Sequence, residues 1–71
     1  MRNFSPERVR LRRKRLGLTQ EALAIKAGTA REYVIEIEKG RKVPKATMLA
    51  KIANALRVRV GYFFVDGVSN N

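Results

Sequence analysis

Apolar residues recur at the spacing of an amphipathic helix in four stretches, and glycine or proline separates each stretch from the next. The first stretch follows Ser5, a residue typical of an N-cap, with Pro6 at the first helical position and Gly17 as the stop. The fourth, residues 45–56, has the most regular apolar stripe, made of Met48, Leu49, Ile52, Ala53 and Leu56. We predict a helix in each, the fourth being the spine of the core.

Two shorter helices are predicted between these. Residues 20–27 form one, and Gly28 ends it after about two turns. Residues 30–40 form the next, which ends at a glycine as well. Each is too short to be stable alone, so both depend on packing against the rest of the chain.

The end of the chain is ambiguous. Residues 60–65 are β-branched and aromatic, but the stretch is too short for its period to distinguish a final helix from a strand. No other stretch alternates strictly enough to predict a strand, and residues 66–71 form a C-terminal tail. The pattern as a whole predicts an all-α fold.

The charge points to a polyanionic partner. The 71 residues suffice for one small domain, and 16 Lys and Arg against six Asp and Glu give a formal net charge of +10. Nucleic acid is the first candidate, an anionic membrane surface the second and an acidic protein the third. The basic residues of the first helix have no broad apolar face opposite them, which disfavours the membrane.

Several function classes lack the residues they need. The sequence has no Cys and no His, so we expect no metal site and no cofactor. Its two serines lie near the ends and no paired carboxylates mark a cleft, so we expect no enzyme. No apolar run is long enough for a signal peptide or a membrane span, which favours a cytoplasmic protein.

Two short helices joined by a tight turn at Gly28 match a helix-turn-helix unit, which presents its second helix to a DNA major groove. Such a corner also occurs in many all-α domains without this function. The corner is therefore compatible with DNA binding without establishing it.

The residues themselves are more specific. The matching features are Leu18-Thr19-Gln20-Glu21, Leu23-Ala24, Ala27-Gly28, Tyr33-Val34, Ile37-Glu38 with Gly40, Pro44, and the helix at 49–56 followed by Val58. With these, the chain resembles the xenobiotic-response-element family of bacterial and phage regulators, the Cro/repressor type. The resemblance implies a compact five-helix domain of the phage-repressor type over residues 5–65, which binds operator-like duplex DNA as a two-fold dimer.

The resemblance also implies the residues that contact DNA. The base-facing positions are Ala30, Arg31, Glu32, Ile35 and Glu36. Gln20 anchors a phosphate at the start of its helix, and the remaining positions that grip the DNA backbone are Lys39, Arg41, Lys42 and Lys45. The sequence departs from the family at Ala30, where a Ser, Thr or Asp cap is usual, and at Arg57 and Gly61, which replace a small turn residue and an acidic one.

Two further sets of residues have expected structural roles. Glu38 projects to the same side as the inward Val34 and Ile37, and the resemblance pairs it with Arg13 in an ion pair between the first and third helices. The C-terminal segment is more apolar than so small a domain easily buries, so we expect it to join a homodimer. Its residues are Tyr62, Phe63, Phe64 and Val65.

The acidic residues of the third helix are unusual for a DNA reader. Glu32 and Glu36 stand one turn apart on the exposed face and would repel phosphates. Either they select sites by accepting a hydrogen bond from a cytosine amino group, or this helix does not enter a groove.

The leading hypothesis is a sequence-specific regulator of transcription that binds double-stranded DNA as a dimer on a palindromic operator. Repression is favoured because occupancy alone blocks polymerase. The alternative is an antitoxin or anti-regulator whose main partner is an acidic protein, a toxin or another regulator.

Overall fold

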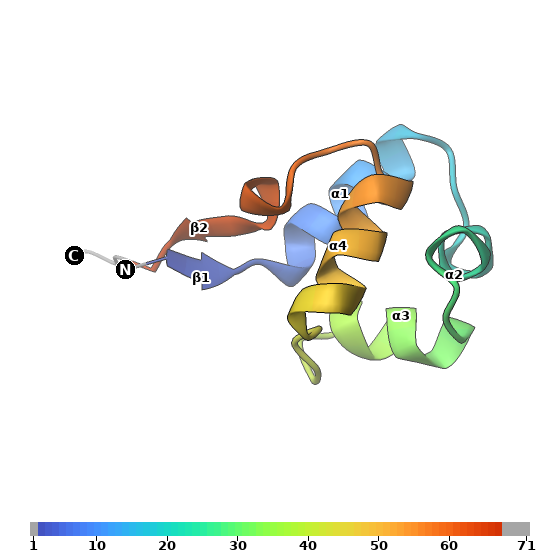
Figure 1. Ribbon diagram of the computed structural model, residues 1–71, viewed down its shortest axis with the longest axis horizontal. Coiled ribbons are helices and arrows are strands. Elements are labelled where there is room, and N and C mark those ends of the chain that lie inside the picture. The colour runs from blue at the N-terminus through green and yellow to red at the C-terminus, as the bar shows by residue number, and fades with distance from the viewer. Residues whose placement is uncertain (1, 68–71) are drawn as a thin grey trace.

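The structure is a computed structural model that describes residues 2–67, and it is mostly helical (Figure 1). Its elements are, in chain order, β1 (Arg2–Phe4), α1 (Pro6–Arg15), α2 (Gln20–Ala27), α3 (Arg31–Glu38), α4 (Ala46–Ala55), the 3₁₀ helix η1 (Val60–Phe63) and β2 (Phe64–Asp66). The prediction of five helices is wrong. In the described residues four α-helices are followed by one 3₁₀ turn, and the chain ends form a small sheet.

The predicted helix starts follow from local hydrogen bonds. The Ser5 hydroxyl accepts from the Arg8 N–H at 3.3 Å ahead of Pro6, and the Thr19 hydroxyl accepts from the Ala22 N–H at 3.0 Å. Both satisfy an N–H that a helix leaves unpaired in its first turn. α3 lacks this support, because Ala30 has no side chain to cap it.

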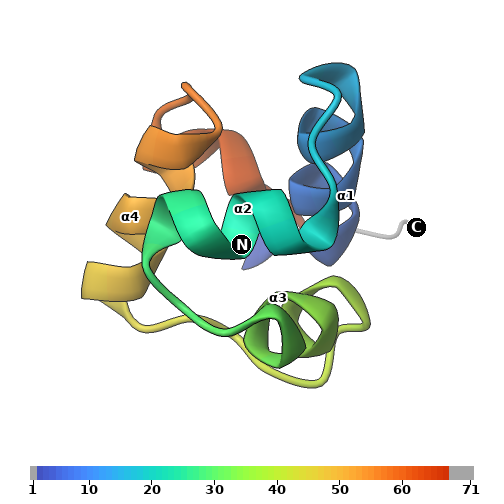
Figure 2. The same ribbon diagram turned by 90° about the vertical axis from the view of Figure 1, so that its right-hand side faces the viewer.

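The core lies where α2 crosses α3 and α4, and α1 stands on the other side of α2 from α4 (Figure 2). Small side chains on α2 allow the helices to approach closely. The buried apolar residues are Val9, Leu23, Ala24, Ala27, Val34, Ile37, Leu49, Ile52, Ala53, Leu56 and Phe63. Leu49, Ile52, Ala53 and Leu56 come from the predicted fourth stripe, so that stripe is the spine of the core.

Residues 2–4 and 64–66 form an antiparallel sheet. The sequence left a helix and a strand open for residues 60–65, and the structure has both in turn, η1 and the start of β2, whereas β1 and its pairing were not predicted. Arg2 pairs with Asp66 and Phe4 with Phe64, and the Ser5 N–H donates to the Phe63 carbonyl at 2.7 Å. Asp66 therefore belongs to β2 and not to a tail, and residues 68–71 of the expected tail lie outside the described residues. Strands of three residues are too short for alternation to reveal them.

Phe63 corrects the expected dimer surface. Its side chain is fully buried, and its ring lies 6.3 Å from that of Phe4 and 5.6 Å from that of Tyr62. The apolar C-terminal segment thus fills the monomer's own core at this position. Aromatic composition alone cannot distinguish a core position from an interface position.

Part of the positive charge holds the C-terminal segment in place. Arg2 donates to the carbonyls of Gly61 and Phe64 at 3.1 and 2.6 Å, while the Arg8 guanidinium donates to the Tyr62 carbonyl at 3.0 Å. Arg12 donates to the carbonyl at the end of α4, that of Leu56, at 2.9 Å. These arginines therefore have a structural role.

Candidate nucleic-acid interface

A left-handed glycine sets the corner between α2 and α3. Gly28 has φ of 71°, and the Thr29 N–H returns to the Ala24 carbonyl at 2.9 Å. The chain then leaves in an extended conformation at Ala30, and α3 starts below α2 in Figure 2. The corner therefore leaves one side of α3 unpacked by the rest of the fold.

The expected base-facing residues share this side of α3. Ala30, Arg31 and Glu32 are exposed at its start, and Ile35 and Glu36 are half-buried one turn later. No ion pair among the described residues includes Arg31 or Glu32. The start of α3 also has no side-chain cap. Its first N–H groups and the positive end of its dipole are thus open to an anion.

Four exposed cations continue this surface beyond the end of α3. They are Lys39, Arg41, Lys42 and Lys45, the positions expected to grip the DNA backbone. The loop turns at Gly40, where φ is 78°, and the Arg41 and Lys42 N–H groups donate to the Glu36 carbonyl at 2.9 and 3.3 Å. This folds the basic loop back against α3.

Side-chain contacts further fix this loop. Arg41 lies 3.5 Å from a Glu36 carboxylate oxygen, and the Lys42 ammonium sits 5.6 Å from the centre of the Tyr33 ring. Neither contact is predicted by a pattern in the sequence. Glu36 and Arg41 are five residues apart, and only a chain reversal at Gly40 brings them together.

A buried polar cluster supports the corner from inside. Arg13 donates to both carboxylate oxygens of Glu38, at 2.6 and 3.0 Å, and its remaining terminal nitrogen donates to the Leu18 carbonyl at 2.8 Å. The side chains of the pair are 9% and 5% exposed. The structure thus brings together the two expected members of the ion pair and links α1 to α3.

Gln20 joins the same cluster. Its side-chain amide donates to Glu38 at 3.1 Å, so one amide hydrogen of the expected phosphate anchor is used inside the domain. The Gln20 backbone N–H lies at the first position of α2, where a helix leaves such groups unpaired. A phosphate contact by Gln20 remains a prediction.

The four carboxylates in this region differ in their partners. Glu21 lies in the first turn of α2, where it suits the helix dipole, Glu38 is paired with Arg13, and Glu36 is near Arg41. Glu32 suits the dipole of α3 in the same way, but it is exposed and no cation among the described residues pairs with it. Glu32 is therefore the acid of α3 that is most open to a partner outside the domain.

The other expected dimer residues are Tyr62, Phe64 and Val65, and all three are half-buried. The Phe64 ring packs edge-on against that of Phe4, with 5.9 Å between the ring centres, and the Arg8 guanidinium carbon lies 5.2 Å from the centre of the Tyr62 ring. The apolar surface left over is smaller than the sequence predicts. A dimer contact here stays a prediction.

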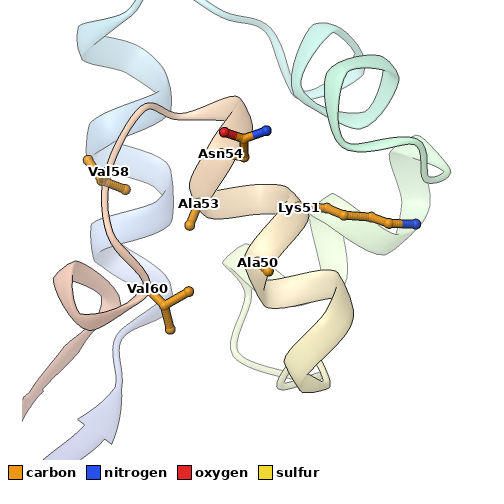
Figure 3. Close-up of a pocket in the computed structure, with 6 residues that line it drawn as sticks. All are labelled: Ala50, Lys51, Ala53, Asn54, Val58 and Val60. Carbon is orange, nitrogen blue, oxygen red and sulfur yellow. The ribbon is translucent and has the colours of Figure 1, made fainter.

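Elsewhere, α4 and residues 58–60 border an open groove of about 460 Å³ (Figure 3). Its lining is Ala50, Lys51, Ala53, Asn54, Val58 and Val60, a set without nucleophile or acid and base pair. Residues 2–67 contain no group of three potential metal ligands. Nor do they contain a helix long and apolar enough to cross a membrane.

Comparisons with known proteins agree with this geometry. Residues 9–63 match the sequence profile of the helix-turn-helix family. The chain is 48% identical over 48 residues to an uncharacterized HTH-type transcriptional regulator of Methanothermobacter thermautotrophicus, covering 68% of this chain and 70% of that protein. It is 43% identical over 60 residues to an uncharacterized transcriptional regulator of Rhodospirillum rubrum, covering 84% of this chain and 56% of that one.

A solved structure extends the likeness to a DNA complex. The P22 c2 repressor in complex with a synthetic operator superposes with a TM-score of 0.81 at 28% sequence identity, over 86% of this chain and 92% of that one. The likeness therefore extends over most of this chain.

Proposed function

The chain belongs to the helix-turn-helix family of Cro/repressor type, whose members are non-enzymatic regulators of transcription that bind DNA, and we propose that it represses transcription as a homodimer on a palindromic operator. Residues 5–65 form the DNA-binding unit, and it acts in the cytoplasm. The observation that carries this proposal is the open start of α3, where Arg31 and Glu32 are exposed, together with four exposed basic positions that follow the helix.

Arg31 and Glu32 supply the base reading. A guanidinium at the start of a recognition helix pairs with guanine, and a carboxylate accepts from the amino group of cytosine. The Glu32 carboxylate repels the DNA phosphates at every site. A hydrogen bond from a cytosine amino group offsets this repulsion only at sites with a cytosine in reach, so Glu32 lowers the affinity for other sequences. Glu36 is held by Arg41 and contributes less.

The loop cations supply affinity without sequence preference. The four residues are exposed at and after the end of α3, and in the proposed complex they would contact the phosphates that flank a helix in the major groove; they are Lys39, Arg41, Lys42 and Lys45. Binding should weaken steeply with salt, with a log–log slope that corresponds to about four to eight released counterions per dimer. A flat dependence between low and physiological ionic strength would argue against DNA as the main partner.

Two copies would meet through the half-buried Tyr62, Phe64 and Val65, next to the sheet at the chain ends (Figure 1). Their α3 helices would then read half-sites about 34 Å apart, one helical turn of DNA. Phe64→Ser should leave a monomer in sedimentation and lower operator affinity. Unchanged mass and affinity would remove this interface.

The proposal is tested by selecting bound duplexes from a random library. We expect an enriched palindrome whose half-sites include guanine and cytosine contacted by Arg31 and Glu32. Arg31→Ala should reduce the enrichment, whereas Lys51→Ala, a matched loss of charge in the groove of Figure 3, should not. Absence of any enriched sequence would instead favour the alternative function, an antitoxin or anti-regulator directed at an acidic protein.

A further inference from the structure

A recess lies between the connection from α1 to α2 and the C-terminal end of α4. It is lined by Leu16, Leu18, Lys26, Ala55 and Arg57 and holds about 280 Å³. We call its three half-buried apolar residues the floor and the exposed Lys26 and Arg57 the rim, and the accessible lining as a whole is more polar than apolar. The site therefore combines two cations with a smaller apolar surface.

No carboxylate contributes to the recess within the described range of residues. Neither Lys26 nor Arg57 takes part in an ion pair there. The adjoining last turn of α1 adds Lys14 and Arg15, both exposed. The rim is thus a cluster of positive charge without an internal counter-charge.

The backbone at Arg57 is a separate indication. A left-handed residue follows each of the four α-helices, at Gly17, Gly28, Gly40 and Arg57, with φ of 72°, 71°, 78° and 59°. Glycine adopts this conformation without strain, whereas a residue with a side chain does not. Arg57 is therefore a residue with a side chain in a conformation that favours glycine, and it lies in the lining of the recess.

The C-terminal ends of α1 and α4, which border the recess, lie on the side of the molecule opposite α3 (Figures 1 and 2). A duplex contacted by the start of α3 and its basic loop would therefore leave Arg57 free for a different anion.

The floor indicates which kind of anion fits. A bare phosphate would use the cations but leave Leu16, Leu18 and Ala55 uncovered, whereas a peptide carrying a carboxylate beside an apolar side chain would use both. We propose that this recess binds an acidic segment of a partner protein, with one apolar side chain on the floor and carboxylates on Lys26 and Arg57. The site goes beyond the proposed DNA function and stays accessible while DNA is bound.

The test is a selection of short random peptides displayed on phage, against the full chain in the absence of DNA. We expect enrichment of peptides with Asp or Glu next to Leu, Ile or Phe. In spectra of the ¹⁵N-labelled protein, the synthesised peptides should shift the amides of Leu16, Leu18 and Ala55 and not those at the start of α3.

Two variants and one control decide the assignment. Both variants should fold, because glycine suits the backbone at position 57 and Lys26 is exposed. Each should lower the affinity for the peptide by about tenfold, as expected for the loss of a charged hydrogen bond. Lys51→Ala removes a cation outside the recess and should leave affinity unchanged. A saturating duplex should not displace the peptide.

Three results would each overturn the assignment. The first is enrichment of peptides without acidic residues, the second is a peptide affinity that neither recess variant changes, and the third is displacement of the peptide by duplex DNA. Because the peptide arm contains no DNA, its result is independent of whether the operator selection succeeds.

Discussion

Removal of the Glu38 carboxylate should be among the most damaging single changes outside the apolar core. In Glu38→Ala the Arg13 guanidinium, 9% exposed, loses two charged hydrogen bonds and keeps only the one to the Leu18 carbonyl. Gln20 loses its acceptor as well. A buried charge left without its partner costs about 3–5 kcal/mol.

That cost is large for this chain. Domains of this kind unfold with about 5–15 kcal/mol in total, and small ones lie near the bottom of that range. Glu38→Ala should therefore be partly or wholly unfolded at 37 °C. By contrast, Arg13→Met combined with Glu38→Leu removes both charges. The free energy of unfolding of this double variant should lie within about 2 kcal/mol of that of the natural chain, because the desolvation of a buried ion pair offsets much of its electrostatic attraction.

Urea denaturation followed by circular dichroism measures these differences as free energies of unfolding. Glu36→Ala is the matched control, because its carboxylate is 30% exposed and its arginine 64% exposed, so loss of that pair should cost less than about 1 kcal/mol. If Glu38→Ala cost no more than Glu36→Ala, or if the double variant were as unstable as the single one, the cluster would not stabilise the corner as described.

Three further changes test the fold with the same denaturation assay. Arg57→Gly should raise the free energy of unfolding by about 1 kcal/mol because glycine relieves the left-handed backbone, and a decrease would contradict the strain at this position. Ala30→Ser supplies the missing cap of α3 and should also add about 1 kcal/mol; no change would mean that the start of α3 is already satisfied. Phe63→Ala should lower the free energy of unfolding by about 3–5 kcal/mol because it truncates a core side chain, whereas a loss below about 1 kcal/mol would contradict the burial of Phe63.

Local signals in the sequence were sufficient for the helices. Caps at Ser5 and Thr19 and glycines at 17, 28 and 40 mark helix ends through bonds within a few residues, so these boundaries are readable from the chain. The same holds for the apolar stripe of α4. These features require no knowledge of distant neighbours.

Non-local features were not readable from local signals, and the one that was expected, the Arg13–Glu38 pair, came from the family resemblance. The sheet joins residues 2–4 to residues 64–66, and neither strand is long enough to show a period. The pairing of Glu36 with Arg41 depends on the reversal at Gly40, and the recess at Arg57 depends on three helices meeting. Each arises only when the whole chain has folded.

A competition titration tests whether Glu32 reads a base at the open start of α3. Natural protein, Glu32→Gln and Glu36→Gln are titrated at fixed salt against the selected duplex and a scrambled one. Glu32→Gln should bind scrambled DNA more tightly through lost repulsion, yet lose about 1–3 kcal/mol of preference for the selected site. Glu36→Gln should change the preference less, since Arg41 already holds that carboxylate. Tighter binding of Glu32→Gln to both duplexes alike, with the preference intact, would show that Glu32 faces solvent and that α3 does not read DNA through it.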